Sequence, residues 1–239
     1  MKILPIKCFV GVFDILGFSD LVTKGELKSV LETYVGMKTE LNTMKKHINM
    51  VLNNLTAIKS QLLSDTFLIY TDAVRDEIFT GLLAMCDALF ISAIKHGLKI
   101  RGAITAGDLI ISGRAVIGKP IIEAHKQESL QDWMGCLLTK ECINLISKEE
   151  LDEYIRNWTI IKYKIPLKSG KVFKQHAFNW IKSLEWSLKF KNHGKPVTKE
   201  QLYEATSLLD KDPNRWEDRR KVYNTRQFRD YAISMIMRK

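Results

Sequence analysis

Cysteine is scarce in this chain and nowhere paired. The four cysteines, Cys8, Cys86, Cys136 and Cys142, form no CxxC pair and have no histidine nearby at zinc-binding spacing. Their neighbours in the sequence are apolar, so we expect small buried thiols and no zinc site or disulfide framework. Proline and glycine are also few, at 5 and 13 of 239 residues, which argues against collagen, disorder and low-complexity repeats.

Long hydrophobic runs are absent as well. No stretch approaches the roughly 18 uncharged apolar residues that a membrane-spanning helix needs, and residues 1–7 lack the apolar core of a signal peptide. We therefore expect a cytoplasmic protein with no membrane partner. The hydrophobic share of 46% and the charged share of 27% are ordinary for a globular protein, and 239 residues suit one domain with a C-terminal elaboration.

Positive charge is concentrated at one end of the chain. The formal net charge is +10, yet residues 1–160 hold 18 Lys and Arg against 19 Asp and Glu, whereas residues 161–239 hold 19 against 8. A basic segment of this kind often binds a polyanion such as nucleic acid, but a solvated helical face is the commoner cause. We expect a basic helical C-terminal extension, and nucleic acid is the less favoured partner.

The apolar pattern switches between that of strands and that of helices. Residues 8–15 form an apolar, β-prone run that predicts a buried strand with Asp14 near its end, followed by a turn over 16–20. Further strands are predicted at 58–63, 66–70, 98–105, 158–165 and 171–178, with a hairpin over 109–117. Helices are predicted at 27–55, 78–94 and 119–130 and from residue 180 onward, with breaks around 192–196 and 210–213. This order indicates an α+β fold with a mainly antiparallel sheet covered by helices.

Two acidic residues stand where these strands end. Asp14 closes the first strand, and Asp65 lies at the tip of the hairpin between 58 and 70. If the strand lies beside the hairpin, the two carboxylates converge and can hold divalent metals on a triphosphate. The backbone amides of Gly17, Phe18 and Ser19 would then face the phosphates. Taken alone, each Asp is as readily explained as a turn former or a helix cap.

Four motifs follow one another along the chain, and their order carries information about the fold. They are FDILGFS at 13–19, LSDTF at 63–67, IRGAITAG at 100–107 and GKPIIEAHKQES at 118–129. This series resembles the class III nucleotidyl cyclase family over about residues 7–145. In that family two Asp residues bind two Mg²⁺ or Mn²⁺ ions, helped by the backbone carbonyl after the first Asp. The resemblance therefore implies that Asp14, the Ile15 carbonyl and Asp65 are metal ligands, with a catalytic domain over 1–180 and an extension over 181–239 packed on it.

The last motif departs from the family pattern at two positions. Ile122 stands where the family has an Asn, and Lys126 stands where it has an Arg that stabilises the transition state. Lys126 keeps the positive charge but loses the bidentate fork of a guanidinium group, so the resemblance implies a catalytic Lys126 with a less fixed orientation. A solvent-facing helix residue is the plainer explanation for Lys126, as it is for Glu123 and His125. Arg101 could meet phosphate or base, or it could brace the sheet.

The positions that read the base in the family differ as well. Gln61 and Ala115 match neither the adenine pair nor the guanine pair of the family, and Arg114 is a neighbouring donor. Together with the opening motif, the helical tail and residues 177–180, this is similar to the bacterial Pycsar pyrimidine cyclases. That resemblance implies UTP, and next CTP, as substrate, a cyclic nucleotide product, a role in anti-phage defence and a separate effector that the product activates.

The resemblance also implies a symmetric homodimer with composite active sites. One chain would supply the metal ligands, and the other would supply Lys126 and the base-contacting residues. Two other interpretations stay open. One is a catalytically silent cyclase-fold module that binds a nucleotide or a partner, which the missing Asn and Arg favour. The other is a nucleic-acid-binding module or a palm-type polymerase. Of these two, the polymerase is improbable, because 239 residues leave no room for a separate fingers-like region.

Overall fold

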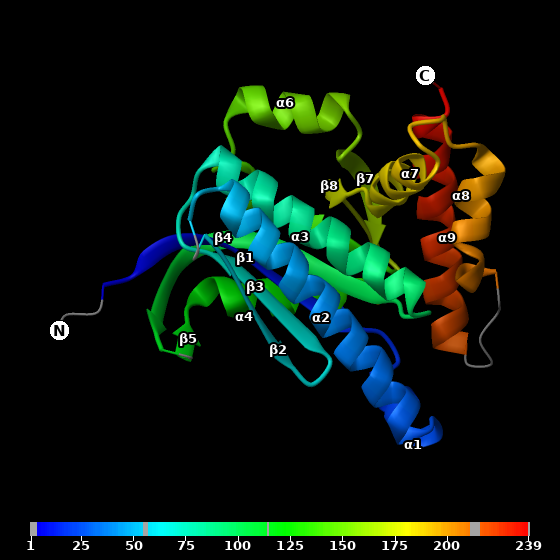
Figure 1. Cartoon of the computed structure of the whole chain (residues 1–239), viewed down its shortest axis with the longest axis horizontal. Helices are drawn as coiled ribbons and strands as arrows, with labels where there is room; N and C mark the ends of the chain where they lie inside the picture. The colour runs from blue at the N-terminus through cyan, green and yellow to red at the C-terminus, as the bar shows by residue number, and fades with distance from the viewer. Residues whose placement is uncertain (1–3, 55–56, 114, 211–215, 239) are drawn as a thin grey trace.

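The architecture is one sheet with helices on both faces (Figure 1). The computed structural model describes residues 4–54, 57–113, 115–210 and 216–238, so Arg114 lies outside the described residues. The strands are β1 (Ile6–Ile15), β2 (Ile58–Leu63), β3 (Thr66–Thr71), β4 (Ile100–Ser112), β5 (Ala115–Ile117), β6 (Gly135–Leu138), β7 (Ile160–Pro166) and β8 (Val172–Phe178). The helices are α1 (Phe18–Lys24), α2 (Leu27–Val51), α3 (Asp76–Lys95), α4 (Lys119–Leu130), α5 (Lys140–Ile143), α6 (Lys148–Arg156), α7 (Trp180–Lys191), α8 (Lys199–Ala205), the short 3₁₀ helix η1 (Ser207–Leu209) and α9 (Trp216–Ile236).

The strand order confirms the predicted fold class. The order is β2-β3-β1-β4-β6-β8-β7, and β5 pairs with β4 outside this path. Among the described strands, the neighbours are antiparallel except for β4 and β6. The protein is therefore an α+β fold with a mainly antiparallel sheet, as the order of elements predicted.

Strand β1 is buried on both of its faces. Phe9 and Phe13 point into the main core, which α2 and α3 cover, while Val10 and Val12 form a second cluster with Ala124 of α4. Figure 1 shows α2 and α3 crossing one face of the sheet, with α4 on the other. A strand covered on both sides has no polar face, and this explains why residues 8–15 form an uninterrupted apolar run.

Helix α3 supplies much of the main core. In the described residues it is the one helix long and apolar enough to cross a membrane, and 61% of its most apolar stretch is buried inside the protein. Gly97 follows the helix with a φ of 70°, the left-handed conformation expected at a glycine C-cap. The four cysteines are buried free thiols, as predicted, and burial raises the pKa of Cys8 to about 11.

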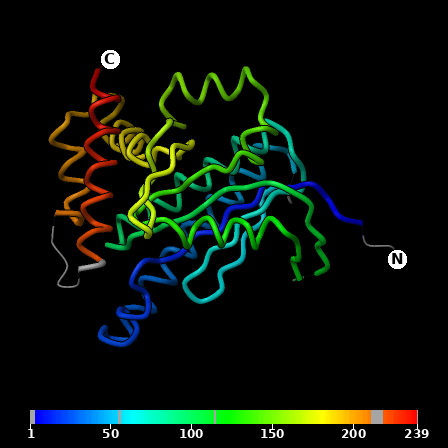
Figure 2. The backbone as a smooth tube through the Cα atoms, turned by 180° about the vertical axis from the view of Figure 1, so that it is seen from behind, coloured from blue at the N-terminus to red at the C-terminus, as the bar shows by residue number. Residues whose placement is uncertain are grey.

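Helices α7 and α9 share this core. Trp180 of α7 stacks on Phe90 of α3 with ring centroids 6.2 Å apart, and Phe228 of α9 packs edge-on against Trp133 at 4.7 Å. Figures 1 and 2 both place the N-terminal end of α9 at the end of the sheet where β1 leads into α1. The last helix of the described chain therefore returns to the end of the first strand.

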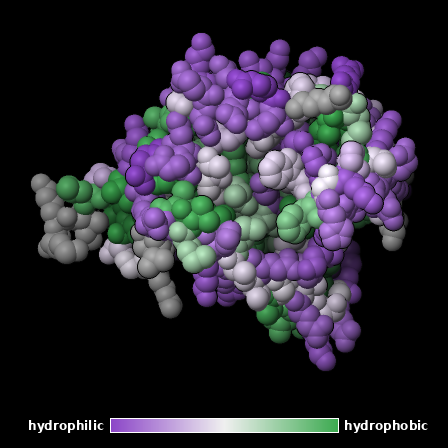
Figure 3. Space-filling view, turned by 45° about the horizontal axis from the view of Figure 1, so that its top comes forward, coloured by the Kyte–Doolittle hydropathy of each residue, from purple (hydrophilic) through white to green (hydrophobic). Residues whose placement is uncertain are grey.

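Part of the positive charge of the extension is neutralised inside the fold. Arg229 is 5% exposed, and its guanidinium lies 2.8 Å from Asp210 and 3.1 Å from Asp230. Arg220 pairs with the buried carboxylate of Asp132. Elsewhere the surface is strongly polar: hydrophilic side chains gather across the top of the face in Figure 3, on the side where Figure 1 places α6.

Two predicted boundaries were wrong, and three elements were not predicted. Strand β4 does not end at residue 105 before a separate hairpin; it runs unbroken to Ser112, because it pairs with β1 from Ile100 to Leu109. The predicted helix over 27–55 ends at Val51. Strand β6 and helices α5 and α6 were not predicted. The four residues of β6 are all buried, so this strand shows no alternation to detect.

Candidate active site

Asp14 and Asp65 come together at one end of the sheet. Asp14 pairs in register with Thr66, and the amide of Ile15 donates a hydrogen bond of 3.1 Å to the carbonyl oxygen of Asp65. Ser64 in the turn has a φ of 56°, so the β2–β3 hairpin reverses tightly beside the end of β1. The two carboxylates line one open pocket of about 360 Å³. The predicted convergence of these two acids is therefore present within a single chain.

Negative charge gathers in this pocket, which Asp14, Asp20, Asp65 and Asp218 all line. Burial raises the pKa of Asp14 to about 6, and the charges of Glu128 and Asp65 raise it further against the opposing effect of Arg101. A bound divalent cation would relieve this charge. In the part of the chain that the structure describes, no group of three or more His, Cys, Asp or Glu side chains could hold a metal ion. Two carboxylates nevertheless fit Mg²⁺ or Mn²⁺, because such ions take their other ligands from water and substrate phosphates.

Arg101 sits beneath Asp14 in a buried network. Its side chain is 6% exposed, and its Nη2 atom lies 3.7 Å from Asp14 Oδ2. Its Nε atom donates to Glu128, whose side chain is 2% exposed, and its Nη1 atom donates to the Gln131 carbonyl oxygen at 2.9 Å. Arg101 therefore braces the sheet against α4, the second of the two roles that the sequence left open. The sequence analysis missed Glu128, although its place four residues after Ala124 puts both on the inward face of α4.

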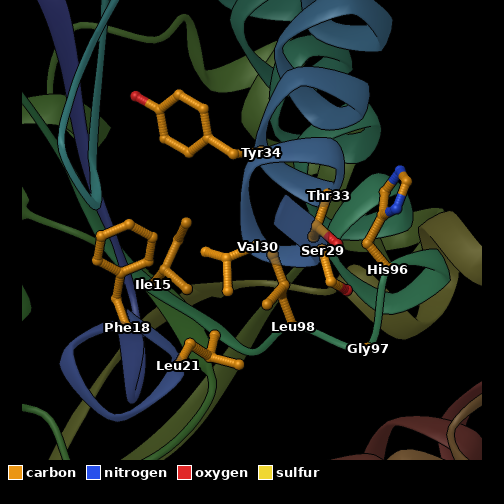
Figure 4. A pocket seen from close by; sticks show the side chains of 10 residues that line it. All are labelled: Ile15, Phe18, Leu21, Ser29, Val30, Thr33, Tyr34, His96, Gly97 and Leu98. Carbon is orange, nitrogen blue, oxygen red and sulfur yellow. The ribbon is translucent and has the colours of Figure 1, made fainter. Parts of the chain in front are cut away.

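The turn after β1 forms another wall of the pocket. Gly17, Phe18 and Ser19 all line it, as the prediction of a phosphate-binding turn requires. Gly17 has a φ of 78°, a left-handed conformation that glycine adopts without strain. The turn also reaches a neighbouring apolar pocket of about 230 Å³, where Figure 4 shows Ile15 and Phe18 grouped with Val30 and Leu98. On this side Phe18 lies beside Tyr34 of α2, with ring centroids 6.4 Å apart.

Three further residues line the pocket that the sequence did not predict as site residues: Asp20 of α1, and Asp218 and Lys221 of α9. Asp218 and Lys221 reach it from α9, about two hundred residues after β1 in the chain. Their Oδ1 and Nζ atoms lie 3.2 Å apart. No sequence motif predicts Asp218 and Lys221 as site residues, because only tertiary packing brings α9 to the pocket.

The other predicted residues lie apart from this pocket in the single chain. Lys126 is exposed on α4, and neighbouring Ile122 is 71% exposed. Gln61 on β2 donates to the Tyr70 hydroxyl at 3.5 Å, and Ala115 is exposed on β5. The structure thus brings together the predicted metal and phosphate ligands, and in the described residues it does not bring Lys126, Gln61 or Ala115 to them.

Solved structures of class III nucleotidyl cyclases share this fold. The guanylyl cyclase Cya2 has a TM-score of 0.52 and 9% identity over 74% of this chain and 93% of its own. The catalytic core of a rhodopsin-guanylyl cyclase with converted specificity, in complex with ATPαS, has a TM-score of 0.51 and 14% identity over 73% and 94%. An adenylate cyclase of Trypanosoma brucei in its monomeric state has a TM-score of 0.52 and 11% identity over 72% and 88%.

No protein-family model and no curated protein matches the sequence. The structural similarity alone shows that the chain has the class III nucleotidyl cyclase fold, as its four motifs predicted.

Proposed function

We propose that this protein is a nucleotidyl cyclase that converts a nucleoside triphosphate to a 3′,5′-cyclic nucleotide and pyrophosphate. The observation that carries the proposal is the convergence of Asp14 and Asp65 beside the Gly17 turn, in one pocket of a class III cyclase fold. Burial and the neighbouring carboxylates disfavour the charged form of Asp14 at this place. The repulsion between Asp14 and Asp65 and the raised pKa of Asp14 are costs, which a bound cation would offset.

The reaction needs positioning and charge neutralisation more than a nucleophilic side chain. The ribose 3′-oxygen forms a bond to the α-phosphorus, the bond from that phosphorus to the bridging oxygen breaks, and the hydroxyl proton passes to water. Asp14, Asp65 and the Ile15 carbonyl would hold two divalent cations, which lower the pKa of the 3′-hydroxyl and neutralise the phosphates. The backbone of Gly17, Phe18 and Ser19 orients the phosphate chain, and Arg101 keeps Asp14 in place.

The proposal includes a homodimer with composite active sites. Lys126 is exposed and stands outside the pocket of its own chain, which supports a role in the pocket of a second copy. There it would neutralise the developing phosphate charge. Gln61, Ala115 and Arg114 would meet the base from that same second copy.

We further propose a pyrimidine substrate, UTP before CTP, and a cyclic nucleotide that acts on a separate effector in anti-phage defence. Gln61 offers both a donor and an acceptor, and Ala115 offers neither, so the second contact of a purine-reading pair is missing. The resemblance to Pycsar cyclases supports this assignment.

The decisive experiment incubates the purified protein with each of the four ribonucleoside triphosphates and Mn²⁺ and separates the products by chromatography. We expect cyclic UMP first. Asp14→Asn and Asp65→Asn should each lower kcat at least 100-fold with an unchanged melting temperature, whereas Asp152→Asn on exposed α6 should leave kcat as it is. Near-normal turnover by either pocket variant would refute the two-metal assignment. Binding of nucleotide without any turnover would favour the catalytically silent module. Ile122 and Lys126, which replace the Asn and Arg of the family, support that alternative.

A further inference from the structure

Helix α9 of the C-terminal extension reaches into the candidate active site. Asp218 and Lys221 line the pocket that contains Asp14 and Gly17. An adjoining pocket of about 150 Å³ shares Gly17, Asp218 and Lys221, and it adds Lys99. Two lysines from distant parts of the chain therefore flank the turn that follows β1. Neither belongs to the four motifs on which the cyclase resemblance rests.

Hydrogen bonds fix this part of α9 to the domain. The Thr225 hydroxyl accepts a bond of 2.8 Å from the Met134 amide, and the Asn224 side chain donates one of 2.8 Å to the Asp132 carbonyl oxygen. Arg220 pairs with the carboxylate of Asp132, which is 2% exposed. Lys221 lies between these anchors, so its place beside the turn does not depend on a flexible tail.

The charges on this wall are complementary to a metal-bound polyphosphate. Lys221 is 25% exposed and pairs with Asp218 at 3.2 Å, which leaves the charge of Lys99 in excess. Burial lowers the pKa of Lys99, and the charge of Lys221 lowers it further against the effect of Asp218, so the two ammonium groups repel each other. Across the pocket stand the carboxylates of Asp14 and Asp65. Asp20 also lines this pocket and Asp218 lies beside Lys221, so anionic oxygens would bind at the two lysines and cations at Asp14 and Asp65.

We propose that Lys221 and Lys99 bind the β- and γ-phosphate oxygens of the substrate within the same chain, so that α9 is part of the catalytic pocket. This inference rests on the proposed function for the identity of the ligand, a nucleoside triphosphate. Phosphate binding would explain part of the positive charge of the C-terminal third without nucleic-acid binding or a merely solvated helical face. It also assigns the two chains of the proposed homodimer different roles: one chain binds the polyphosphate, and the second copy contributes Lys126.

The test measures polyphosphate binding as well as turnover. Isothermal titration of the full-length protein with inorganic tripolyphosphate and Mn²⁺ gives the affinity without any chemistry. Lys221→Gln should weaken binding about tenfold or more, Lys221→Arg should retain most of it, and Lys99→Gln should weaken it to a lesser degree. Lys189→Gln, an equal loss of charge at an exposed position of α7, is the matched control and should bind like the unmodified protein. In turnover, Lys221→Gln should raise KM.

The outcomes separate this inference from the proposed function. If tripolyphosphate binds and Lys221→Gln weakens it, the inference stands even when no nucleotide is cyclised, and the proposed function then fails alone. If nucleotides are cyclised and Lys221→Gln changes neither KM nor the tripolyphosphate affinity, the inference fails and the function stands. Should Lys221→Gln lower the melting temperature by several degrees, Lys221→Arg and Lys99→Gln decide. Affinities of both Lys221→Gln and Lys99→Gln equal to that of Lys189→Gln overturn the proposal.

Discussion

The buried pair of Arg101 and Glu128 should contribute strongly to stability, in an asymmetric way. Replacing Glu128 by Met leaves the Arg101 guanidinium with the Gln131 carbonyl and with Asp14 at 3.7 Å, so its charge keeps partial compensation. Replacing Arg101 by Met leaves Glu128 with the exposed His125 at 3.7 Å and the charge of Lys168, and it also deprives Asp14 of the Arg101 guanidinium. The second change should therefore be the more costly.

The size of each effect follows from burial. Removing one partner of a buried ion pair typically costs about 3–5 kcal/mol, because the remaining charge is left without water or a partner. We expect about 3 kcal/mol for Glu128→Met and about 5 kcal/mol for Arg101→Met. At roughly 2–4 °C per kcal/mol for a chain of this length, the melting temperature should fall by about 6–20 °C. The double variant should lose less than Arg101→Met alone, since no unpaired charge remains at the site.

Urea denaturation followed by circular dichroism gives the free energy of unfolding for all four proteins of this cycle. A coupling energy of more than about 3 kcal/mol is expected, because the double variant should lose less than Arg101→Met alone. NMR titration provides a second measurement: the pKa of Asp14 should rise in Arg101→Met and fall in Glu128→Met, because the two groups act on it with opposite sign. Additive losses in the double variant would mean that the two side chains do not depend on each other, and the account of the network would be refuted.

Two further predictions concern the core. Burial raises the pKa of Asp87 to about 6, against the effect of its hydrogen bond from Ser183. The protonated form stabilises the fold fully below about pH 4, and this stabilisation is lost as the pH rises through 6. In urea denaturation at pH 7.5, Asp87→Asn should therefore be more stable than the unmodified protein by about 3 kcal/mol, and below pH 4 the two should be equally stable. An equal difference at both pH values would contradict this. Gly102→Ala would place its Cβ atom 2.2 Å from Phe13 Cδ1 and should lower the free energy of unfolding by about 1–3 kcal/mol, measured by calorimetry. The Cβ atom of Gly17→Ala meets no atom within 4 Å, so this variant should lose only about 1 kcal/mol through backbone strain. Equal melting temperatures of the two glycine variants would show that the core yields around Phe13.

Local signals predicted the parts of the fold that one segment determines by itself. The predicted helix over 119–130 has the observed bounds of α4, and the hairpin over 58–70 differs from β2 and β3 by one residue. Both segments have clear periodicity and a turn or a glycine at their ends. Strand β6 escaped prediction because burial on every side removes the alternation of polar and apolar residues.

The candidate site divides in the same way. Asp14 and Asp65 were found because each ends a strand and both belong to motifs with a fixed order. Lys221 has no such context: the sequence around it predicts only a basic amphipathic helix, and its place beside Gly17 depends on bonds to Asp132 and Met134. Residues that tertiary packing delivers to a site leave no local trace in one sequence.

The return of α9 to the end of β1 also has a consequence for synthesis on the ribosome. The nascent chain exposes Asp14 and Gly17 before the pocket wall formed by Asp218 and Lys221, which emerges about two hundred residues later. A polypeptide released early, before residue 218, would keep both acidic residues but lack that wall. Premature termination would therefore yield products with an incomplete pocket, and the pocket reaches its full form only once translation has passed Lys221.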